Sequence, residues 1–281
     1  MDEAMSKPEF ILSSNPDDWV EVQNLLKRKV ILEDNFMWSI SASESSLKGT
    51  SESHRLRFIG GVDISFCKDD PSIACGAIVI VDIASMEVVY DDYNLTQLQI
   101  PYVPGFLAFR EGPVLLELLE KMKLHTKLYY PQLLMVDGNG LLHPRGFGLA
   151  SHLGVMADLP TIGVGKNLHH VDGLTQSGVK KLLEGNTKSD GDVITLTGNS
   201  GFTWGVAMRS SEDSIKPIFI SIGHRISLET ATKVVKMCCK YRIPEPIRQA
   251  DIRSRAYLLR NARSLKIAYE ASSSRPACNR E

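Results

Sequence analysis

The pattern of apolar and polar residues at the start of the chain predicts one helix followed by an open segment. An Asn-Pro-Asp sequence places the start of that helix near Pro16. Its apolar residues recur at helical spacing, namely Trp19, Val22, Leu26 and Val30. The next stretch, Ser41 to Arg55, has almost no apolar content, which is typical of a linker or mobile loop. We expect the helix to clasp a main domain that begins after this linker.

Three β-rich runs follow, separated by short turn-like segments. They read FIGGVDISF, ACGAIVIVDI and MEVVYDDYNL, and their short connections predict an antiparallel meander. Helix, strand, helix and strand patterns come next, in GFLAFREGPVLLELLEKMK, QLLMVD, FGLASHLGVMADL and TIGVGK. Three antiparallel strands followed by α-β-α-β predict an α/β fold with a mixed β-sheet and helices on both faces.

The rest of the chain predicts two more strands and two more helices after a polar stretch. The strand patterns are FTWGVAMRS and PIFISIG, and the helices are expected near residues 227–241 and 247–259. The polar stretch that begins after Asn167 carries no clear periodicity, so we assign no element to it. No internal repeat is present, and the patterns together describe one large domain with extensions.

Composition narrows the class of protein. The chain is 43% hydrophobic and 23% charged, which is typical of a soluble globular protein with a sizeable core. Its formal net charge is −1, so any electrostatic attraction for nucleic acid must come from a local patch. The five cysteines show no metal-binding or disulfide-framework spacing. No stretch approaches the ~18 apolar residues of a membrane span or forms a secretory signal. We expect an intracellular protein of the cytoplasm and nucleus or nucleolus, with no membrane partner.

Three carboxylates fall where the predicted elements would bring them together. Asp63 lies in the middle of the first strand, after two glycines that permit close approach of a ligand or another backbone. Asp137 ends a strand at the sheet edge where α/β proteins bind ligands. Glu111 lies in VPGFLAFREGP, where the apolar pattern predicts Leu or Ala. Like charges so close together need a cation, and all-oxygen ligands favour Mg²⁺, with Mn²⁺ also suitable.

Each carboxylate also has a simpler explanation. Asp63 would pair with an arginine, Asp137 would be a turn residue, and Glu111 would lie near the positive end of a helix dipole. For any single residue the two explanations are about equally good. The coincidence of all three favours the metal site.

Five blocks of sequence extend this interpretation. They are GGVDISF, PYVPGFLAFREGP, VDGNGLLHPRGFGLASHLGV, PTIGVGK and RIPEPIRQAD, and together they resemble the endonuclease V family from about Phe58 to Arg255. The resemblance implies a ribonuclease H-like fold and a metal-dependent nuclease that cleaves the second phosphodiester bond 3′ of a deaminated purine, chiefly inosine. It makes Asp63 and Asp137 direct metal ligands and Glu111 a further metal-site carboxylate.

The resemblance also divides the chain. We expect an N-terminal helix and flexible linker at residues 1–55, an endonuclease V-like catalytic domain at 56–260, and a C-terminal tail at 261–281. The segments at the two ends have no counterpart in the simplest form of the family, and the stretch from His169 to Asn199 looks family-variable.

Three more residues gain a catalytic role by resemblance. Lys166 closes TIGVGK, where an ammonium would neutralise the phosphate or orient the attacking water. His143 matches a family active-site histidine, and the alternative is an exposed loop histidine. Asp251 matches a fourth metal-site position, and the alternative is an ion pair with Arg248 or Arg255 on its own helix.

Recognition of the base is expected from the loop before Glu111. Tyr102 lies between Pro101 and Pro104, which stiffen the backbone so that the ring can fill the gap left by an extruded base. Without the resemblance, ordinary packing of this tyrosine is the simpler interpretation. By the same match, a tight pocket for hypoxanthine is lined by Gly105, Leu107, Gly138, Gly140 and Leu149.

A local basic segment suggests a path for phosphate. From Arg242 to Lys266 the chain carries seven Arg or Lys residues against two acids. A solvated helix face explains this segment equally well, but its closeness to Asp251 favours a nucleic-acid track.

These features predict a monomeric endonuclease acting on inosine-containing RNA or DNA. The long termini and the block CCKYRIPEPIRQADI resemble the eukaryotic branch of the family, which implies a preference for inosine in single-stranded RNA. One alternative is a DNA-repair endonuclease directed at deoxyinosine. A catalytically inactive binder of inosine-containing nucleic acid would have lost a carboxylate. A metal-dependent phosphotransferase or phosphatase acting on a nucleotide would have no use for a wedge tyrosine.

Overall fold

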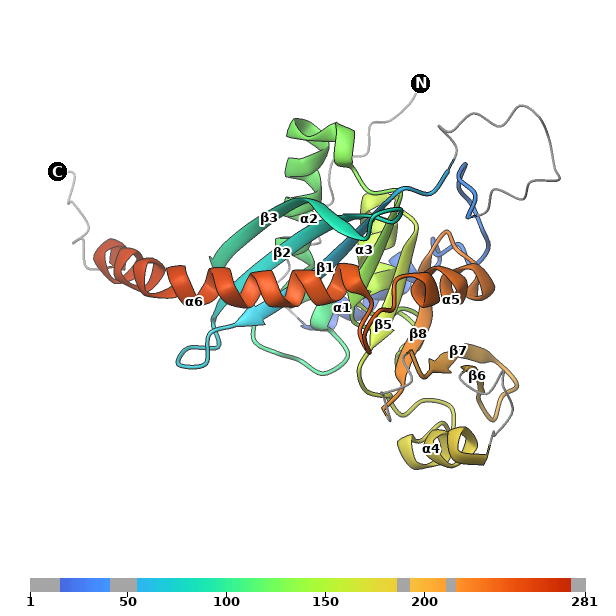
Figure 1. The fold of residues 1–281 in the computed structure, drawn as a ribbon. Helices are drawn as coiled ribbons and strands as arrows, with labels where there is room; N and C mark the ends of the chain where they lie inside the picture. Colours follow the sequence, from blue (N-terminus) through green and yellow to red (C-terminus); the bar gives the residue numbers. More distant parts are fainter. Residues whose placement is uncertain (1–15, 41–54, 186–192, 211–215, 274–281) are drawn as a thin grey trace, which may run out of the picture.

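The computed structural model describes residues 16–40, 55–185, 193–210 and 216–273 of the chain. Within them, eight strands form one sheet in the order β3-β2-β1-β4-β5-β8-β7-β6 (Figure 1). The strands are β1 (Phe58–Phe66), β2 (Ile73–Asp82), β3 (Glu87–Gln97), β4 (Leu133–Asp137), β5 (Thr161–Gly165), β6 (Val193–Thr197), β7 (Thr203–Met208) and β8 (Ile218–His224). The helices are α1 (Pro16–Lys27), α2 (Leu107–His125), the 3₁₀ turn η3 (Lys127–Tyr129), α3 (Leu149–Ala157), α4 (Gln176–Gly185), α5 (Leu228–Met237) and α6 (Glu245–Ser273).

Alternation of side chains along the strands builds a core on each face of the sheet. In β4, Leu133 and Met135 pack with residues of α5 and α6, whereas Leu134 and Val136 pack with residues of α2 and α3. Strand β2 is buried at every position, because it lies inside the sheet with helices on both sides. Helix α6 runs across β1, β2 and β3 (Figure 1).

The strand order explains how the predicted carboxylates meet. Strands β1, β2 and β3 form the predicted antiparallel meander, and β1 also pairs in parallel with β4. The register sets Val62 opposite Val136, so Asp63 and Asp137 each follow a member of that pair on neighbouring strands. The predicted mixed sheet is confirmed.

Gly61 lets another backbone approach β1, as the sequence predicted for the Gly-Gly pair. A Cβ atom added at Gly61 would lie 2.1 Å from the backbone of Pro246, in the first turn of α6. No larger residue fits at that distance, so Gly61 sets the contact between α6 and the sheet.

The first predicted helix is also confirmed, and it packs as a clasp. Trp19, Val22 and Leu26 of α1 are buried in a small core with Phe109 and Phe147. Val30 follows the end of α1 rather than lying in it. The predicted linker, except for Arg55, lies outside the described residues.

Two elements escaped the sequence pattern, and one extends beyond it. Helix α4 and strand β6 lie in the polar stretch to which no element was assigned, because each buries only a narrow apolar face. Helix α6 runs on to Ser273, past the end expected near Leu259 and past the predicted start of the tail. Among the described helices, none has the length and apolar character to cross a membrane.

Candidate active site

Four acidic residues from four elements lie close together at the centre of the sheet. Asp63 comes from β1, Asp137 from the end of β4, Glu111 from α2 and Asp251 from α6. Asp63 and Glu111 are buried, with 9% and 8% of their surface exposed. The charges of Asp137 and Asp251 act on Asp63, and the charge of Asp137 acts on Glu111. The structure therefore brings together the acidic set predicted from the sequence.

Burial and nearby negative charge raise the pKa of Asp63 and of Glu111. Burial raises the pKa of Asp63 to about 8, helped by the charge of Asp137, a hydrogen bond with it and the charge of Asp251. Burial likewise raises the pKa of Glu111 to about 7, with Arg110 opposing and Asp137 reinforcing the shift. Without a cation, the cluster reduces its charge by holding protons.

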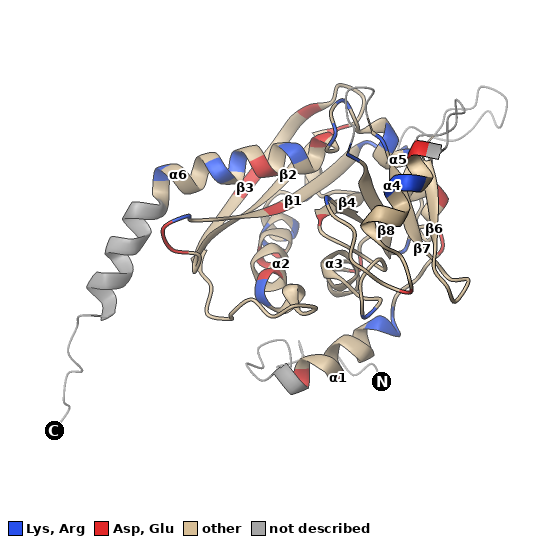
Figure 2. Cartoon of the chain, turned by 90° about the horizontal axis from the view of Figure 1, so that it is seen from below, with Lys and Arg blue, Asp and Glu red and all other residues tan. Residues whose placement is uncertain are grey.

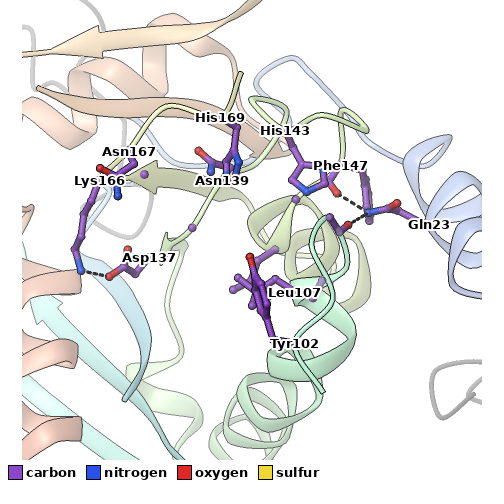
Figure 3. A pocket seen from close by; sticks show the side chains of 16 residues that line it. Gln23, Tyr102, Leu107, Asp137, Asn139, His143, Phe147, Lys166, Asn167 and His169 are labelled. Atoms are coloured by element: carbon purple, nitrogen blue, oxygen red, sulfur yellow. Dashed lines mark hydrogen bonds and ion pairs between the residues drawn. The ribbon is translucent and has the colours of Figure 1, made fainter. Parts of the chain in front are cut away.

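Lys166 supplies a positive charge to the same cluster. It follows β5 and forms an ion pair with Asp137 (Figure 3). Burial lowers the pKa of Lys166, but the charges of Asp137, Asp63 and Asp251 outweigh burial and raise it. Arg242 holds the backbone at this point, because its guanidinium donates a 3.0 Å hydrogen bond to the Lys166 carbonyl.

The chemistry of the cluster suits a hard divalent cation. All of its possible metal ligands are carboxylate oxygens, and the charge of Asp137 raises the pKa of Asp63, so a cation between them would relieve the repulsion. As the side chains lie, however, no group of three or more His, Cys, Asp or Glu residues in the described part of the chain is arranged to hold a metal ion. The ammonium of Lys166 supplies positive charge to Asp137 in this arrangement.

Asp251 forms the ion pair that the simpler interpretation predicted, and it also lies beside the acidic cluster. Its carboxylate forms a 2.7 Å ion pair with Arg255, one turn along α6, as the simpler explanation predicted. It also lies close enough to Asp63 to raise the pKa of that side chain. Ser254 connects α6 to β1, because its hydroxyl lies 2.7 Å from Ser65 Oγ and 3.4 Å from Asp63 Oδ2.

His143 is a buried histidine, so its interpretation as an exposed loop residue is wrong. Only 7% of its surface is exposed. Burial lowers its pKa to about 4, and the neighbouring His169, Arg145 and Lys27 add to the shift. His143 is therefore neutral at pH 7, and its ring lies 6.0 Å from that of His169.

A cavity of about 270 Å³ adjoins this acidic cluster (Figure 3). Its lining includes Asp137, Lys166 and His143 together with most of the residues predicted to bind nucleic acid, namely Tyr102, Gly105, Leu107, Gly138 and Leu149. Tyr102 is 63% exposed, so ordinary packing does not explain it. The residues predicted to act in catalysis and those predicted to recognise the base thus line the same cavity.

Gly140 is the one member of this predicted set that lies elsewhere. It does not line the cavity. A Cβ atom added there would lie 2.0 Å from the carbonyl oxygen of Ile222 in β8, and the Gly140 amide donates to Ser221 Oγ at 2.9 Å. Gly140 therefore permits the close approach of two backbones rather than of a base.

The cavity also contains residues that sequence reasoning missed. They are Gln23, Ala108, Asn139, Phe147, Gly148, Gly165, Asn167 and His169. A signal existed for Asn139, which lies in the Gly-Asn-Gly turn after Asp137, and for Asn167 and His169, which follow Lys166. No local signal existed for Gln23, because its hydrogen-bond partners at the cavity, Gly105 and Phe147, lie 82 and 124 residues further along the chain.

Most arginines of the basic segment have protein partners in the described part of the chain. Blue and red bands stand side by side along α6 in Figure 2, and basic and acidic side chains of this helix form ion pairs with one another. Arg248 pairs with Glu245 at 2.7 Å, Arg255 pairs with Asp251, and Arg253 pairs with Asp91. Arg242 donates to three carbonyl oxygens. The side chains of Arg263 and Lys266 lie outside the described residues.

Comparison with known proteins gives consistent matches. A family model described as Endonuclease V matches residues 41–252. Mouse Endonuclease V is 45% identical over 250 residues, covering 89% of this chain and 71% of the mouse protein. The crystal structure of human ENDOV matches with a TM-score of 0.79 and 42% identity, covering 88% of this chain and all of that one.

A fourth match contains nucleic acid. It is the crystal structure of Ciona intestinalis Endonuclease V in complex with a 23mer DNA that contains an inosine followed by a ribo-adenosine. The TM-score is 0.78 at 33% identity, and the match covers 87% of this chain and 97% of that chain.

Proposed function

The chain belongs to the endonuclease V family of nucleases, which are hydrolases with a ribonuclease H-like fold, and from this premise we propose that it is a metal-dependent endonuclease directed at inosine. One observation carries the proposal. Asp137 and Lys166, which suit phosphodiester hydrolysis, line the same cavity as the exposed ring of Tyr102, which suits base extrusion.

We propose that the cavity takes the extruded hypoxanthine. Tyr102 would fill the gap in the base stack, and Gly105, Leu107, Gly138 and Leu149 would surround the base. Two of these positions have a positive φ, +83° at Gly105 and +157° at Gly138, so glycine lets their backbone groups turn toward a bound base. A cavity of about 270 Å³ fits a purine far better than a whole nucleotide strand.

The acidic cluster would hold the metal ion. Asp63 and Asp137 would be its direct ligands, with Glu111 and Asp251 completing the site, and Mg²⁺ or Mn²⁺ suits their oxygen donors. When bound, the ion would stabilise charge on the phosphate and on the leaving 3′ oxygen. Lys166 would donate to a non-bridging phosphate oxygen or orient the attacking water. His143, which is neutral, would offer a hydrogen bond in the same cavity.

The reaction would be hydrolysis of the second phosphodiester bond 3′ of inosine. Water attacks the phosphorus atom and the 3′ oxygen leaves, which yields a 3′-hydroxyl on one fragment and a 5′-phosphate on the other. We further propose that single-stranded RNA is the preferred substrate. The Ciona complex supports this preference, because its DNA carries a ribose directly 3′ of the inosine.

The same complex also keeps the DNA alternative open, because the rest of its strand is DNA. A nuclease that acts on deoxyinosine would use the same cavity and acidic cluster. The inactive binder is disfavoured, because Asp63, Glu111 and Asp137 are all present and close together. The nucleotide phosphotransferase or phosphatase is disfavoured by family membership.

Cleavage of matched oligonucleotides tests the proposal. Four oligonucleotides of one sequence would be compared. The first is RNA with a single inosine, the second is DNA with a single deoxyinosine, and the third is that DNA with one ribose directly 3′ of the inosine. The fourth is the RNA with adenosine in place of inosine. With Mg²⁺ we expect cleavage of the first and third strands, slower cleavage of all-DNA and none of the adenosine strand. Equal rates on RNA and DNA would refute the RNA preference, and equal cleavage of the adenosine strand would refute inosine recognition.

A further inference from the structure

Helix α1 lies outside the segment that matches the family model, yet it contributes a side chain to the cavity. The match begins at residue 41, whereas α1 spans Pro16–Lys27. Gln23 of α1 lines the cavity, and only 2% of its surface is exposed. A buried amide at a binding cavity needs hydrogen-bond partners, and those of Gln23 show what it does.

The amide of Gln23 connects two loops that belong to different parts of the chain. Its Nε2 donates to the carbonyl oxygen of Phe147 at 2.9 Å and to that of Gly105 at 3.2 Å (Figure 3). Its Oε1 accepts a hydrogen bond from Arg145 Nε. One side chain thus bonds to the loop that carries Tyr102 and to the loop that follows His143.

Packing and charge hold α1 in place for this contact. The ring of Trp19 stacks on Phe109 with centroids 5.1 Å apart and meets Phe106 at 5.8 Å. The guanidinium of Arg145 lies 5.3 Å from the centre of the Phe106 ring. Lys27 donates to the Arg145 carbonyl at 2.8 Å. Residues on both sides of Gln23 therefore anchor α1 to the same two loops.

The two loops form neighbouring parts of the cavity wall. Gly105 and Tyr102 line it from one loop, and Phe147 and Gly148 line it from the other. Because the same nitrogen donates to a carbonyl of each loop, its two hydrogen bonds hold those carbonyls close together, and the length of the side chain lets the amide reach them from α1. A change in the separation of the two loops would move the wedge relative to the space that receives the base.

We propose that Gln23 is a positioning residue for inosine recognition, which holds the Tyr102 loop at the correct distance from the base cavity. The inference rests on the proposed function, since it assigns Gln23 a role in the same site. Gln23 does not touch the acidic cluster, so it acts on base binding and selectivity, and chemistry at saturation is left to Asp63, Asp137 and Lys166.

Single-turnover cleavage with increasing protein concentration tests this role. Gln23→Leu removes both donated hydrogen bonds, and Gln23→Asn keeps the amide but shortens the side chain by one methylene, so the amide no longer reaches the two carbonyls. For an inosine RNA strand with Mg²⁺, we expect the half-saturating concentration of either variant to rise about tenfold, while the rate at saturation changes less than about twofold. Leu25→Ala, an exposed change on the same helix, is the control and should match the unaltered protein.

A double substitution separates positioning from general loosening of the fold. If Gln23 acts through the wedge, adding Gln23→Leu to Tyr102→Ala should cost less than about twofold, because the loop then carries no ring to position. Full, independent losses in the double variant would overturn the proposal. The proposal would also be overturned if both Gln23 variants kept the half-saturating concentration of the unaltered protein and its preference for inosine over adenosine. If the unaltered protein fails to cleave inosine strands, the proposed function itself is refuted.

Discussion

At Asp63, burial and two neighbouring carboxylates act in the same direction. They place its pKa at about 8, so the side chain holds a proton at pH 7 when no cation is bound. A divalent cation must displace that proton, and binding of the ion should therefore strengthen as the pH rises toward 8.

Asp63→Asn and Asp137→Asn should each abolish cleavage, because each removes a charge from the proposed ligand set. Binding of inosine strands should persist, since Tyr102 and the cavity glycines are untouched. Single-turnover assays with Mg²⁺, together with binding measured in EDTA, would separate the two effects. Glu120→Gln, an exposed carboxylate on α2, is the control. Near-normal turnover of either aspartate variant would disprove the metal site.

Lys166→Met should slow single-turnover cleavage, because it should remove about 2–4 kcal/mol of transition-state stabilisation. This loss is comparable to that of one oxyanion donor. The variant should also shift the rising limb of the pH–rate profile to higher pH. Lys166 lowers the pKa of Asp63, so removing its charge raises that pKa further. An unchanged rate and an unchanged profile would show that Lys166 is only structural.

At the scale of elements, the contact between β1 and α6 determines how the acidic cluster is assembled. Gly61 lies on β1 two residues before Asp63, and α6 carries Asp251 and Ser254. The hydrogen bonds of Ser254 show that the helix reaches the strand at the level of Asp63. Any displacement of α6 therefore changes the site as well as the core.

Gly61→Ala should destabilise the fold and impair cleavage together. The added methyl would lie 2.1 Å from the Pro246 backbone, so α6 must shift, at a cost of about 1–3 kcal/mol in the free energy of unfolding. Urea unfolding and cleavage below the unfolding transition would measure both effects. Gly112→Ala in α2 is the contrast for stability, because its methyl would lie at an ordinary 3.7 Å from His152. Equal stability of the two variants would contradict the tight contact.

At the scale of the whole molecule, a buried histidine couples folding to pH. His152 of α3 is enclosed by Phe109 and Phe147, and its Nδ1 has no hydrogen-bond partner among the described residues. Burial lowers its pKa from 6.5 to about 4. Between these values the unfolded chain binds more protons than the folded chain. Stability from this group is thus present above pH 6.5 and is lost as the pH falls through 4.

His152→Leu should weaken that dependence. Between pH 7 and pH 5, the unaltered protein should lose about 2 kcal/mol of unfolding free energy through His152 alone, and the variant should not. Urea unfolding at both pH values measures the difference. Some pH dependence should remain in the variant, because burial also lowers the pKa of His143. An identical loss in both proteins would show that His152 is not the group responsible.

Much of the fold and of the acidic cluster could be predicted from local sequence patterns. The alternation in the first three strands predicted the meander, and the positions of Asp63 within a strand and Asp137 at a strand end predicted their convergence. These features are local, because side-chain period and strand ends depend on a few adjacent residues. The order of the sequence blocks, by resemblance, supplied Lys166 and Tyr102 as well.

Other features were decided only when the chain packed. Gln23 reaches the cavity through hydrogen bonds that span 82 and 124 residues, and no local window records such partners. The burial of His143 and the packing of Gly140 against β8 depend likewise on which strands become neighbours. Arg253 and Arg255 of α6 form ion pairs with carboxylates that folding brings near. Arg253 pairs with Asp91 of β3, and Arg255 pairs with Asp251 one helical turn away. Sequence by itself determined which side chains are available for the proposed chemistry. Tertiary structure decided which of them line the cavity, because long-range contacts set the partners of each side chain.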